Sequence, residues 1–396
     1  MTAILPPRRF WSLVYLTFTL LTFLAASSAP TPLYHIYQQA WTFSPAMLTL
    51  IFGVYALSLL SALLTVGSLS DYLGRKPVLL LALLLEILSM LLFIAAADVT
   101  WLIFARLVQG FATGIATSSL GAALLDNDKL QGPLLNSLAP LLGMGFGALG
   151  SSLLAEFAPQ PLRLAYIVAL ALFVFQAILL TRLPESVSRQ PGALASLKPT
   201  LSVPVRARST LLRVLPINTA TWSLSGFFLS LAPSVVRLAT GNDSNLIGGA
   251  LVAVLTLAGA AAIYSLRTRQ PDSVLRLGVT LLACGLAVIM LAARSGSLTL
   301  FFIGTLVAGL GFGSAFLGSV RSIMPLAHPH ERAGLMATFY VLSYLAFCVP
   351  SFIAGAMVRR FGLLATTNGY ALMVIALCAL ALLNLMRRNP GLADSR

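Results

Sequence analysis

The sequence predicts an all-α membrane protein in which twelve transmembrane helices form two pseudo-symmetric bundles of six. Of the 396 residues, 58% are hydrophobic and only 9% are charged. A water-soluble protein needs roughly 25% charged residues to cover its surface. The apolar residues also gather in runs of about 20, the length at which an α-helix crosses the hydrocarbon core. A soluble chain of one or two domains is therefore excluded.

The apolar runs place the predicted helices in chain order, with mostly short connections between them. The first run follows Arg8 and Arg9, and Pro30 follows it in place of a small-residue cleavage site, so we interpret this run as a span. The approximate spans are 10–29, 46–66, 78–97, 100–125, 133–156, 163–182, 213–236, 245–266, 276–293, 298–320, 333–357 and 364–386.

One connection is much longer than the others. Residues 183–212 contain four prolines together with several basic residues. Long segments without regular structure are uncommon inside a compact unit and often serve as linkers. We therefore expect an N-terminal six-helix bundle at residues 1–182, a flexible cytoplasmic linker at 183–212 and a C-terminal six-helix bundle at 213–396.

Lysine and arginine predict the orientation, because positively charged loops are retained on the cytoplasmic side. With both termini cytoplasmic, nineteen of the 25 basic residues face inward and Arg106 lies within a span. The remaining five face outward: Arg163, Arg237, Arg294, Arg359 and Arg360. Bases clustered beside spans, without a basic domain, also argue against nucleic-acid binding despite a net charge of +14.

Two short patterns recur and indicate a duplicated unit. Leu107-Val108-x-Gly110-x-x-x-Gly114 returns 199 residues later as Leu306-Val307-x-Gly309-x-x-x-Gly313. Ala29-Pro30 returns 203 residues later as Ala232-Pro233. Similar offsets favour two related six-helix halves, an architecture in which the binding site lies at the midplane between them.

A polar loop between the second and third spans carries the most specific motif. It runs from Gly67 to Pro77 as Gly-Ser-Leu-Ser-Asp-Tyr-Leu-Gly-Arg-Lys-Pro. This pattern resembles the loop between helices two and three of major facilitator superfamily transporters, and the chain most resembles their twelve-helix drug or metabolite–proton antiporter branch. The resemblance implies a conformational latch made of Gly67, Asp71, Gly74, Arg75, Lys76 and Asp126.

The resemblance also implies roles within this latch. Asp71 would cap the eleventh helix near Ala333, where free N–H groups and the helix dipole favour an acid. Arg75 would pair with Asp126, and both contacts would hold the halves together while the site faces outward. The alternative is that Asp71 and Arg75 only shape the turn and fix the topology.

Three polar residues inside spans are candidates for proton coupling. Arg106-Leu107-Val108-Gln109-Gly110 resembles the arginine–glutamine–glycine signature of the fourth helix, and a guanidinium within the membrane normally faces a partner inside the bundle. Glu86 is the one acid far from both membrane edges, and desolvation favours its neutral form. We expect Arg106, Glu86 and Gln109 to act in coupling, with Glu156 as a weaker partner for Arg106. The alternative is a structural role for these buried groups.

Aromatic and amide side chains on cavity-lining helices are candidates for substrate contact. Tyr340, Tyr344 and Phe347 share one face of the eleventh predicted helix. The full candidate set is Tyr55, Asn136, Asn218, Trp222, Tyr340, Tyr344 and Phe347. The alternative is that this aromatic stripe only packs.

These features predict a secondary transporter that exports a small neutral or lipophilic compound in exchange for protons. The alternative is transport of a sugar or another metabolite in either direction. Three histidines near span edges and three cysteines without ligand spacing form no recognised catalytic or metal centre, so we expect no enzyme, cofactor or metal. The expected protein is a monomer in a bacterial inner membrane, with a small-molecule substrate, protons and lipid as its partners.

Overall fold

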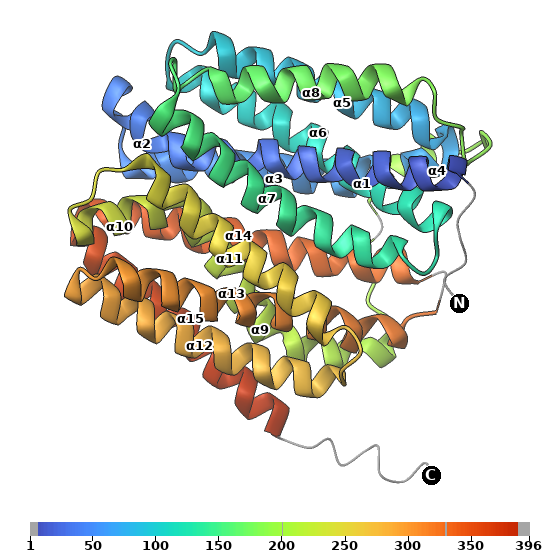
Figure 1. Cartoon of the computed structure of the whole chain (residues 1–396). Coiled ribbons are helices and arrows are strands. Elements are labelled where there is room, and N and C mark those ends of the chain that lie inside the picture. The colour runs from blue at the N-terminus through green and yellow to red at the C-terminus, as the bar shows by residue number, and fades with distance from the viewer. Residues whose placement is uncertain (1–6, 200, 329–330, 387–396) are drawn as a thin grey trace.

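The computed structural model describes residues 7–199, 201–328 and 331–386, and these residues form α-helices, two short 3-10 helices and no strand. The all-α prediction is confirmed. Figure 1 shows the helices as two groups that lie side by side. The α-helices are α1 (Pro7–Ser28), α2 (Pro30–Trp41), α3 (Pro45–Thr65), α4 (Leu69–Leu73), α5 (Arg75–Ala95), α6 (Val99–Asn127), α7 (Gly132–Phe157), α8 (Leu164–Leu180), α9 (Val205–Ser230), α10 (Ala232–Thr240), α11 (Asn245–Leu266), α12 (Pro271–Ser295), α13 (Leu298–Ile323), α14 (Arg332–Phe361) and α15 (Leu363–Met386).

The helices coincide with the twelve predicted spans. Ten spans within the described residues are long and apolar enough to cross a membrane by themselves, counting α1 and α2 together. The pair α9 and α10, bent by 62°, forms an eleventh. Helix α8, with 17 residues, stands at the remaining position and has the minimum length for a span. The predicted count of twelve is consistent with this arrangement.

Proline interrupts the first and seventh spans at equivalent places. Helix α1 ends before Pro30, and α9 ends before Ala232-Pro233. Proline lacks the N–H that a helix needs to bond the carbonyl four residues earlier. The carbonyls of Ala26 and Leu229 therefore lose their usual partner, and the structure supplies other donors to both.

The recurring glycine pattern has the same packing role in both halves. A methyl group on Gly110 or Gly114 of α6 would lie within 2.6 Å of a backbone oxygen of α3. Gly309 and Gly313 of α13 stand equally close to backbone oxygens of α11. Only glycine permits this approach between helix backbones. The duplicated motif thus builds one close helix pair in each half.

Buried apolar side chains form two large cores and a smaller third cluster. One core draws on residues 13–180, and the other draws on residues 207–385 together with Leu141. The third cluster joins α3, α7, α9, α11 and α14, including Phe52, Leu229 and Phe347. We call this contact between the halves the seam. The division at residues 182 and 213 stays a prediction, and α9 already begins at Val205, inside the segment expected to be linker.

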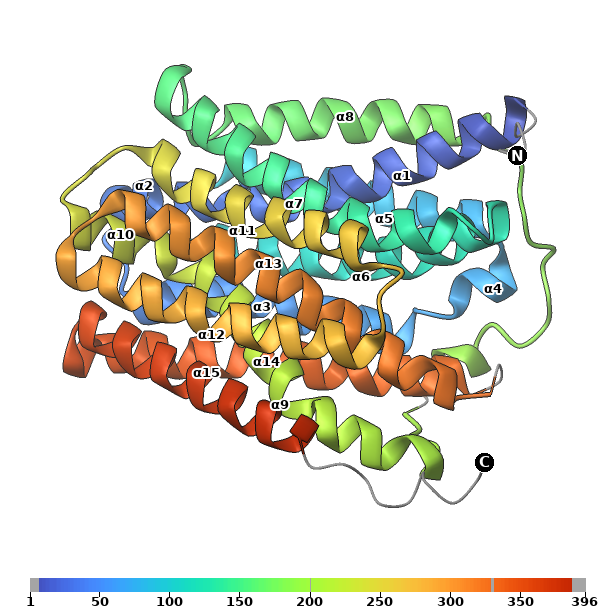
Figure 2. The ribbon, with the colours of Figure 1, turned by 60° about the horizontal axis from the view of Figure 1, so that its bottom comes forward.

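The two ends of the helix bundle differ in what they hold. The Asp71 end carries α4 and residues 183–199 and 201–204, the start of α1 lies there, and α15 runs toward it (Figures 1 and 2). The Asn245 end carries α10, the last turn of α7 and the start of α11. Two hydrogen bonds between described residues cross the seam on the side of the Asn245 end, Thr31 Oγ1 to Leu229 O (3.2 Å) and Asn245 N to Glu156 Oε2 (2.8 Å).

Candidate functional site

Arg75 organises the polar cluster at the Asp71 end. Its Nε donates to Asp126 Oδ2 at 3.0 Å, its Nη1 donates to Ser70 Oγ at 2.7 Å, and it also forms an ion pair with Asp71. The Arg75 side chain is only 11% exposed, whereas that of Asp71 is 55% exposed. One guanidinium therefore joins α4, α5 and α6 through three acceptors.

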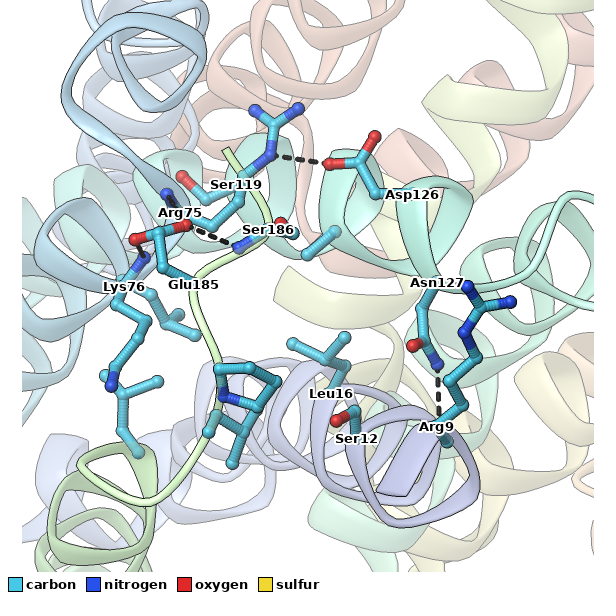
Figure 3. A pocket seen from close by; sticks show the side chains of 15 residues that line it. Arg9, Ser12, Leu16, Arg75, Lys76, Ser119, Asp126, Asn127, Glu185 and Ser186 are labelled. Atoms are coloured by element: carbon cyan, nitrogen blue, oxygen red, sulfur yellow. Dashed lines mark hydrogen bonds and ion pairs between the residues drawn. The ribbon is translucent and has the colours of Figure 1, made fainter. Parts of the chain in front are cut away.

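Helix α5 receives its N-terminal cap from a distant segment of the chain. The carboxylate of Glu185 accepts hydrogen bonds from the backbone N–H groups of Arg75 (2.9 Å) and Lys76 (3.0 Å) (Figure 3). The residue before the helix is Gly74, which has no side chain to provide a cap. Sequence reasoning did not assign this role to Glu185, although the absence of a local cap before Arg75-Lys76-Pro77 was a signal for it.

Gly74 is required by this cap for two reasons. Its φ of +100° and ψ of 153° fall in a region open essentially to glycine alone. A methyl group at this position would also lie 2.7 Å from Glu185 Oε2.

We expect Gly74→Ala to destabilise the protein by about 1–3 kcal/mol, the usual cost of that backbone conformation for a residue with a side chain. Thermal unfolding of the purified protein in detergent measures the change. Gly150→Ala is the matched control, because a methyl group on Gly150 in α7 would meet nothing within 4 Å. Equal melting temperatures for the two variants would contradict the assignment.

A cavity of about 320 Å³ opens beside this cap, between α1, α5, α6 and the end of α8 (Figure 3). Charged groups of both signs line it, among them Arg9, Lys76 and Asp126. The Lys76 ammonium donates to Thr181 O at the end of α8 (3.1 Å), and Asn127 Nδ2 donates to Arg9 O (2.9 Å). The cavity lies within the N-terminal half and away from the seam.

Asp71 does not reach α14 in this conformation. Within the described part of the chain its carboxylate pairs with Arg75 alone. The start of α14 is instead occupied by Glu331, which accepts a hydrogen bond from His328 N (2.9 Å) and pairs with Arg206. The His328 N–H and the Arg206 guanidinium hold the pKa of Glu331 below its usual value. The expected cap of Asp71 on the eleventh span is thus absent here, while the Arg75–Asp126 contact is present.

A second polar cluster is sealed inside the N-terminal half. Glu86 of α5 and Arg106 and Gln109 of α6 are all at most 1% exposed. Arg106 Nη1 donates to Gln109 Oε1 (2.7 Å), and Gln109 Nε2 donates to Glu86 Oε1 (3.2 Å). The amide therefore bridges the acid and the base, which form no direct ion pair. Glu156, the alternative partner for Arg106, lies at the seam and bonds Asn245 instead.

The break before Pro30 supplies the acceptors for this cluster. Gln109 Nε2 donates to the Ala26 carbonyl (3.1 Å), whose normal helical partner would have been the missing N–H of Pro30. Arg106 Nη1 donates to the neighbouring Ser27 carbonyl (2.8 Å). On another side, the Arg106 guanidinium lies 4.2 Å from the centre of the Tyr55 ring. Such a cation–π contact is favourable and strengthens away from water.

Aromatic side chains gather at the seam. The Trp222 ring of α9 lies 5.0 Å from that of Tyr344 and 6.0 Å from that of Phe347, both on α14. Tyr340 adjoins Tyr344 at 6.3 Å, and Phe52 of α3 faces Phe347 at 4.7 Å across the seam. Trp222, Tyr340 and Tyr344 are only partly buried. We call these five residues the aromatic cluster.

The two amides expected at a substrate site both make contacts inside the helix bundle in this conformation. Asn218 is 3% exposed, and its Nδ2 donates to Ser343 Oγ at 3.0 Å, so its amide joins α9 to α14. Asn136 of α7 packs on α6, where a methyl group on Gly121 would lie 3.1 Å from Asn136 Oδ1. Tyr55 lies beside the Arg106 guanidinium and also interacts electrostatically with Tyr344 of the aromatic cluster. Sequence reasoning missed Phe52, since nothing in its own span marks it as a seam residue.

Long apolar helices in two groups, charges sealed inside one half and an aromatic cluster between the halves define a multi-pass integral membrane protein of the transporter class. The model of the Major Facilitator Superfamily matches residues 13–349. The chain therefore belongs to this superfamily of secondary transporters, as the Gly67–Pro77 loop predicts.

Relatives agree with this assignment. The chain is 27% identical over 293 residues to the multidrug resistance protein MdtL of Klebsiella pneumoniae, covering 69% of this chain and 71% of that protein. It is 36% identical over 104 residues to an uncharacterized transporter of Rickettsia felis, a match that spans only 25% of each chain.

Solved structures show the same fold. The human organic anion transporter MFSD10 superimposes with a TM-score of 0.68 at 20% identity, covering 95% of this chain and all of that one. A bacterial homologue of the human lysosomal transporter Spinster, in an inward-facing and unoccupied conformation, gives a TM-score of 0.73 at 14% identity, with 96% and 98% covered. The predicted two-bundle fold is confirmed by these likenesses.

Proposed function

We propose that this protein exports a small neutral or lipophilic compound across a bacterial inner membrane in exchange for protons, by alternating access between its two halves. The Asp71 end faces the cytoplasm in this proposal, with both termini on that side. The excess of lysine and arginine in the loops of this end supports that orientation. The Klebsiella relative, a multidrug resistance protein, supports export of a drug-like compound.

The observation that carries the proposal is the position of Tyr55 between the sealed polar cluster and the aromatic cluster. Its ring lies 4.2 Å from the Arg106 guanidinium, and it interacts electrostatically with Tyr344 of the aromatic cluster. The aromatic cluster offers rings and the Trp222 indole N–H, which has no partner among the described residues. Such a surface suits an apolar compound with a hydrogen-bond acceptor. A sugar site would require several free amides, whereas Asn218 is bonded to Ser343 and Asn136 packs on Gly121.

Glu86 is the proposed proton carrier. One of its carboxyl oxygens accepts from Gln109, and the other has no partner within the described residues. A carboxyl group sealed in an apolar bundle is stable when neutral and is ionised only at a cost, which Arg106 offsets through Gln109. Proton release from Glu86 would therefore change the hydrogen bond between Gln109 and Arg106. A shift of Arg106 would in turn move Tyr55, which lies beside the seam.

The test is flux in proteoliposomes across an imposed pH gradient, with a panel of lipophilic compounds. We expect Glu86→Gln to abolish the dependence of flux on the gradient, because the amide cannot release a proton. Asp128→Asn is the matched control and should keep that dependence, since Asp128 only caps the local turn at Leu130 N (2.7 Å) and Gln131 N (2.9 Å). Gradient-driven flux that survives in Glu86→Gln would rule out Glu86 as the carrier.

A further inference from the structure

The end of the seam opposite Asp71 holds a carboxylate that bonds one half to the other. Glu156 lies in the last turn of α7, in the N-terminal half, and α11 belongs to the C-terminal half. Glu156 Oε2 accepts a hydrogen bond from the backbone N–H of Asn245, the first residue of α11, at 2.8 Å. A carboxylate at the C-terminal end of its own helix is unfavourably placed, whereas the N-terminus of a helix stabilises it. The position of Glu156 is therefore favourable only while the two halves touch.

The start of α11 is arranged to leave this N–H available. Ser244 Oγ accepts from Leu246 N (3.2 Å), so the local cap takes the next N–H along and not that of Asn245. Arg237 of α10 donates to Asp243 O (2.7 Å) and approaches Asn245 Oδ1 (3.4 Å), which fixes the loop before the helix. The C-terminal half thus presents one oriented donor, and the N-terminal half supplies the charge that meets it.

A second bond supports the same closure. Thr31 Oγ1 of α2 donates to the carbonyl of Leu229 (3.2 Å), which Pro233 deprives of its usual helical donor. The equivalent carbonyl in the first half, that of Ala26, is bonded within its own half by Gln109. The proline of the first Ala-Pro pair therefore frees an acceptor for the buried polar cluster, and that of the second frees an acceptor for a bond across the seam.

We infer that Glu156 is a latch residue that holds the two halves closed at the Asn245 end, with the Thr31–Leu229 bond as its secondary contact. The inference rests on the proposed alternating access, in which this end must open. Opening separates the Glu156 carboxylate, which is already exposed to solvent, from the α11 N-terminus. Glu156 thereby sets the balance between the conformation described here and one that is open at the Asn245 end.

Distance measurements between spin labels test the latch without any transport assay. Labels at Ala40→Cys and Ser295→Cys report on the Asn245 end from the two halves, in a chain with Cys284→Ser because Cys284 is exposed. We expect Glu156→Ala to raise the ratio of open to closed molecules about tenfold, as the loss of one charge-assisted hydrogen bond implies. Glu156→Gln, which keeps an uncharged acceptor, should shift the ratio in the same direction by less.

Asp98→Ala is the matched control. Asp98 is also a carboxylate at the Asn245 end, but it caps α6 within its own half, accepting from Thr100 N at 2.7 Å. The distribution of spin-label distances in Asp98→Ala should equal that of the parent chain. Unchanged distributions in both Glu156 variants would overturn the latch. A shift in those variants would uphold it even if the proteoliposome assay detected no proton-coupled export, so the two proposals fail separately.

Discussion

Arg106→Gln is expected to reduce transport by about a hundredfold, which corresponds to about 2.7 kcal/mol. The guanidinium donates to Ser27 O and Gln109 Oε1, and it also lies over the Tyr55 ring. Hydrogen bonds to charged groups contribute about 1.5–3 kcal/mol each, so the variant loses the interactions that position Gln109 against Glu86. Initial rates of flux in proteoliposomes, normalised to folded protein, measure the effect.

Arg106→Lys separates charge from geometry at the same position. A lysine ammonium keeps the positive charge but cannot present the planar fork that reaches two acceptors while facing a ring. We expect transport to remain at least about tenfold below that of the parent, in line with the loss of one such bond. Arg163→Gln is the matched control, since Arg163 is exposed before α8 and should be replaceable without loss. Parental flux in folded Arg106→Gln would refute a role for this cluster in transport.

Asp71→Asn is expected to lower flux at least tenfold while changing the free energy of unfolding by less than about 1 kcal/mol, the usual scale of an exposed ion pair. In the conformation described here Asp71 is 55% exposed and, among the described residues, its ion pair is with Arg75, so little stability is at stake. The proposed latch acts in the other conformation, where the carboxylate would meet the start of α14. Loss of that contact would therefore alter transport and not folding.

Asp272→Asn is the matched control for Asp71→Asn. Asp272 is also exposed at the Asp71 end, where it lies 3.7 Å from Arg213 within the C-terminal half. It should be replaceable with little effect on flux and on thermal unfolding. If Asp71→Asn transports as fast as Asp272→Asn, Asp71 only shapes its turn and the latch is wrong.

Much of the fold follows from the sequence because membrane insertion is a local property. A run of about 20 apolar residues can satisfy its backbone only as a helix, whatever surrounds it. The breaks at Pro30 and Pro233 are similarly local, since proline removes one helical hydrogen bond wherever it stands. The apolar pattern marks a span and not the whole helix: α9 begins at Val205, before the predicted span at 213–236, because amphipathic or basic residues can be helical without being apolar.

The contacts at the candidate sites likewise divide into local ones, which the sequence predicts, and distant ones, which it does not. Motif residues that interact along one loop or one helix, such as Asp71 with Arg75 or Arg106 with Gln109, could be paired from spacing alone. Partners far apart in sequence could not be found in this way. The cap that Glu185 provides to α5 and the bond between Asn218 and Ser343 both depend on which segments pack together.

By itself, the sequence determined the membrane class, the spans, the duplication and the superfamily, because hydrophobic length and short motifs act over a few turns of chain. Only the tertiary structure decided that Gln109 bridges Glu86 and Arg106, and that Glu156 faces the other half and not Arg106. These contacts are two hydrogen bonds at Gln109 and one at Glu156, and each requires placement to within a few tenths of an ångström. That precision comes from packing whole helices against one another, and a pattern of residues along the chain does not specify it.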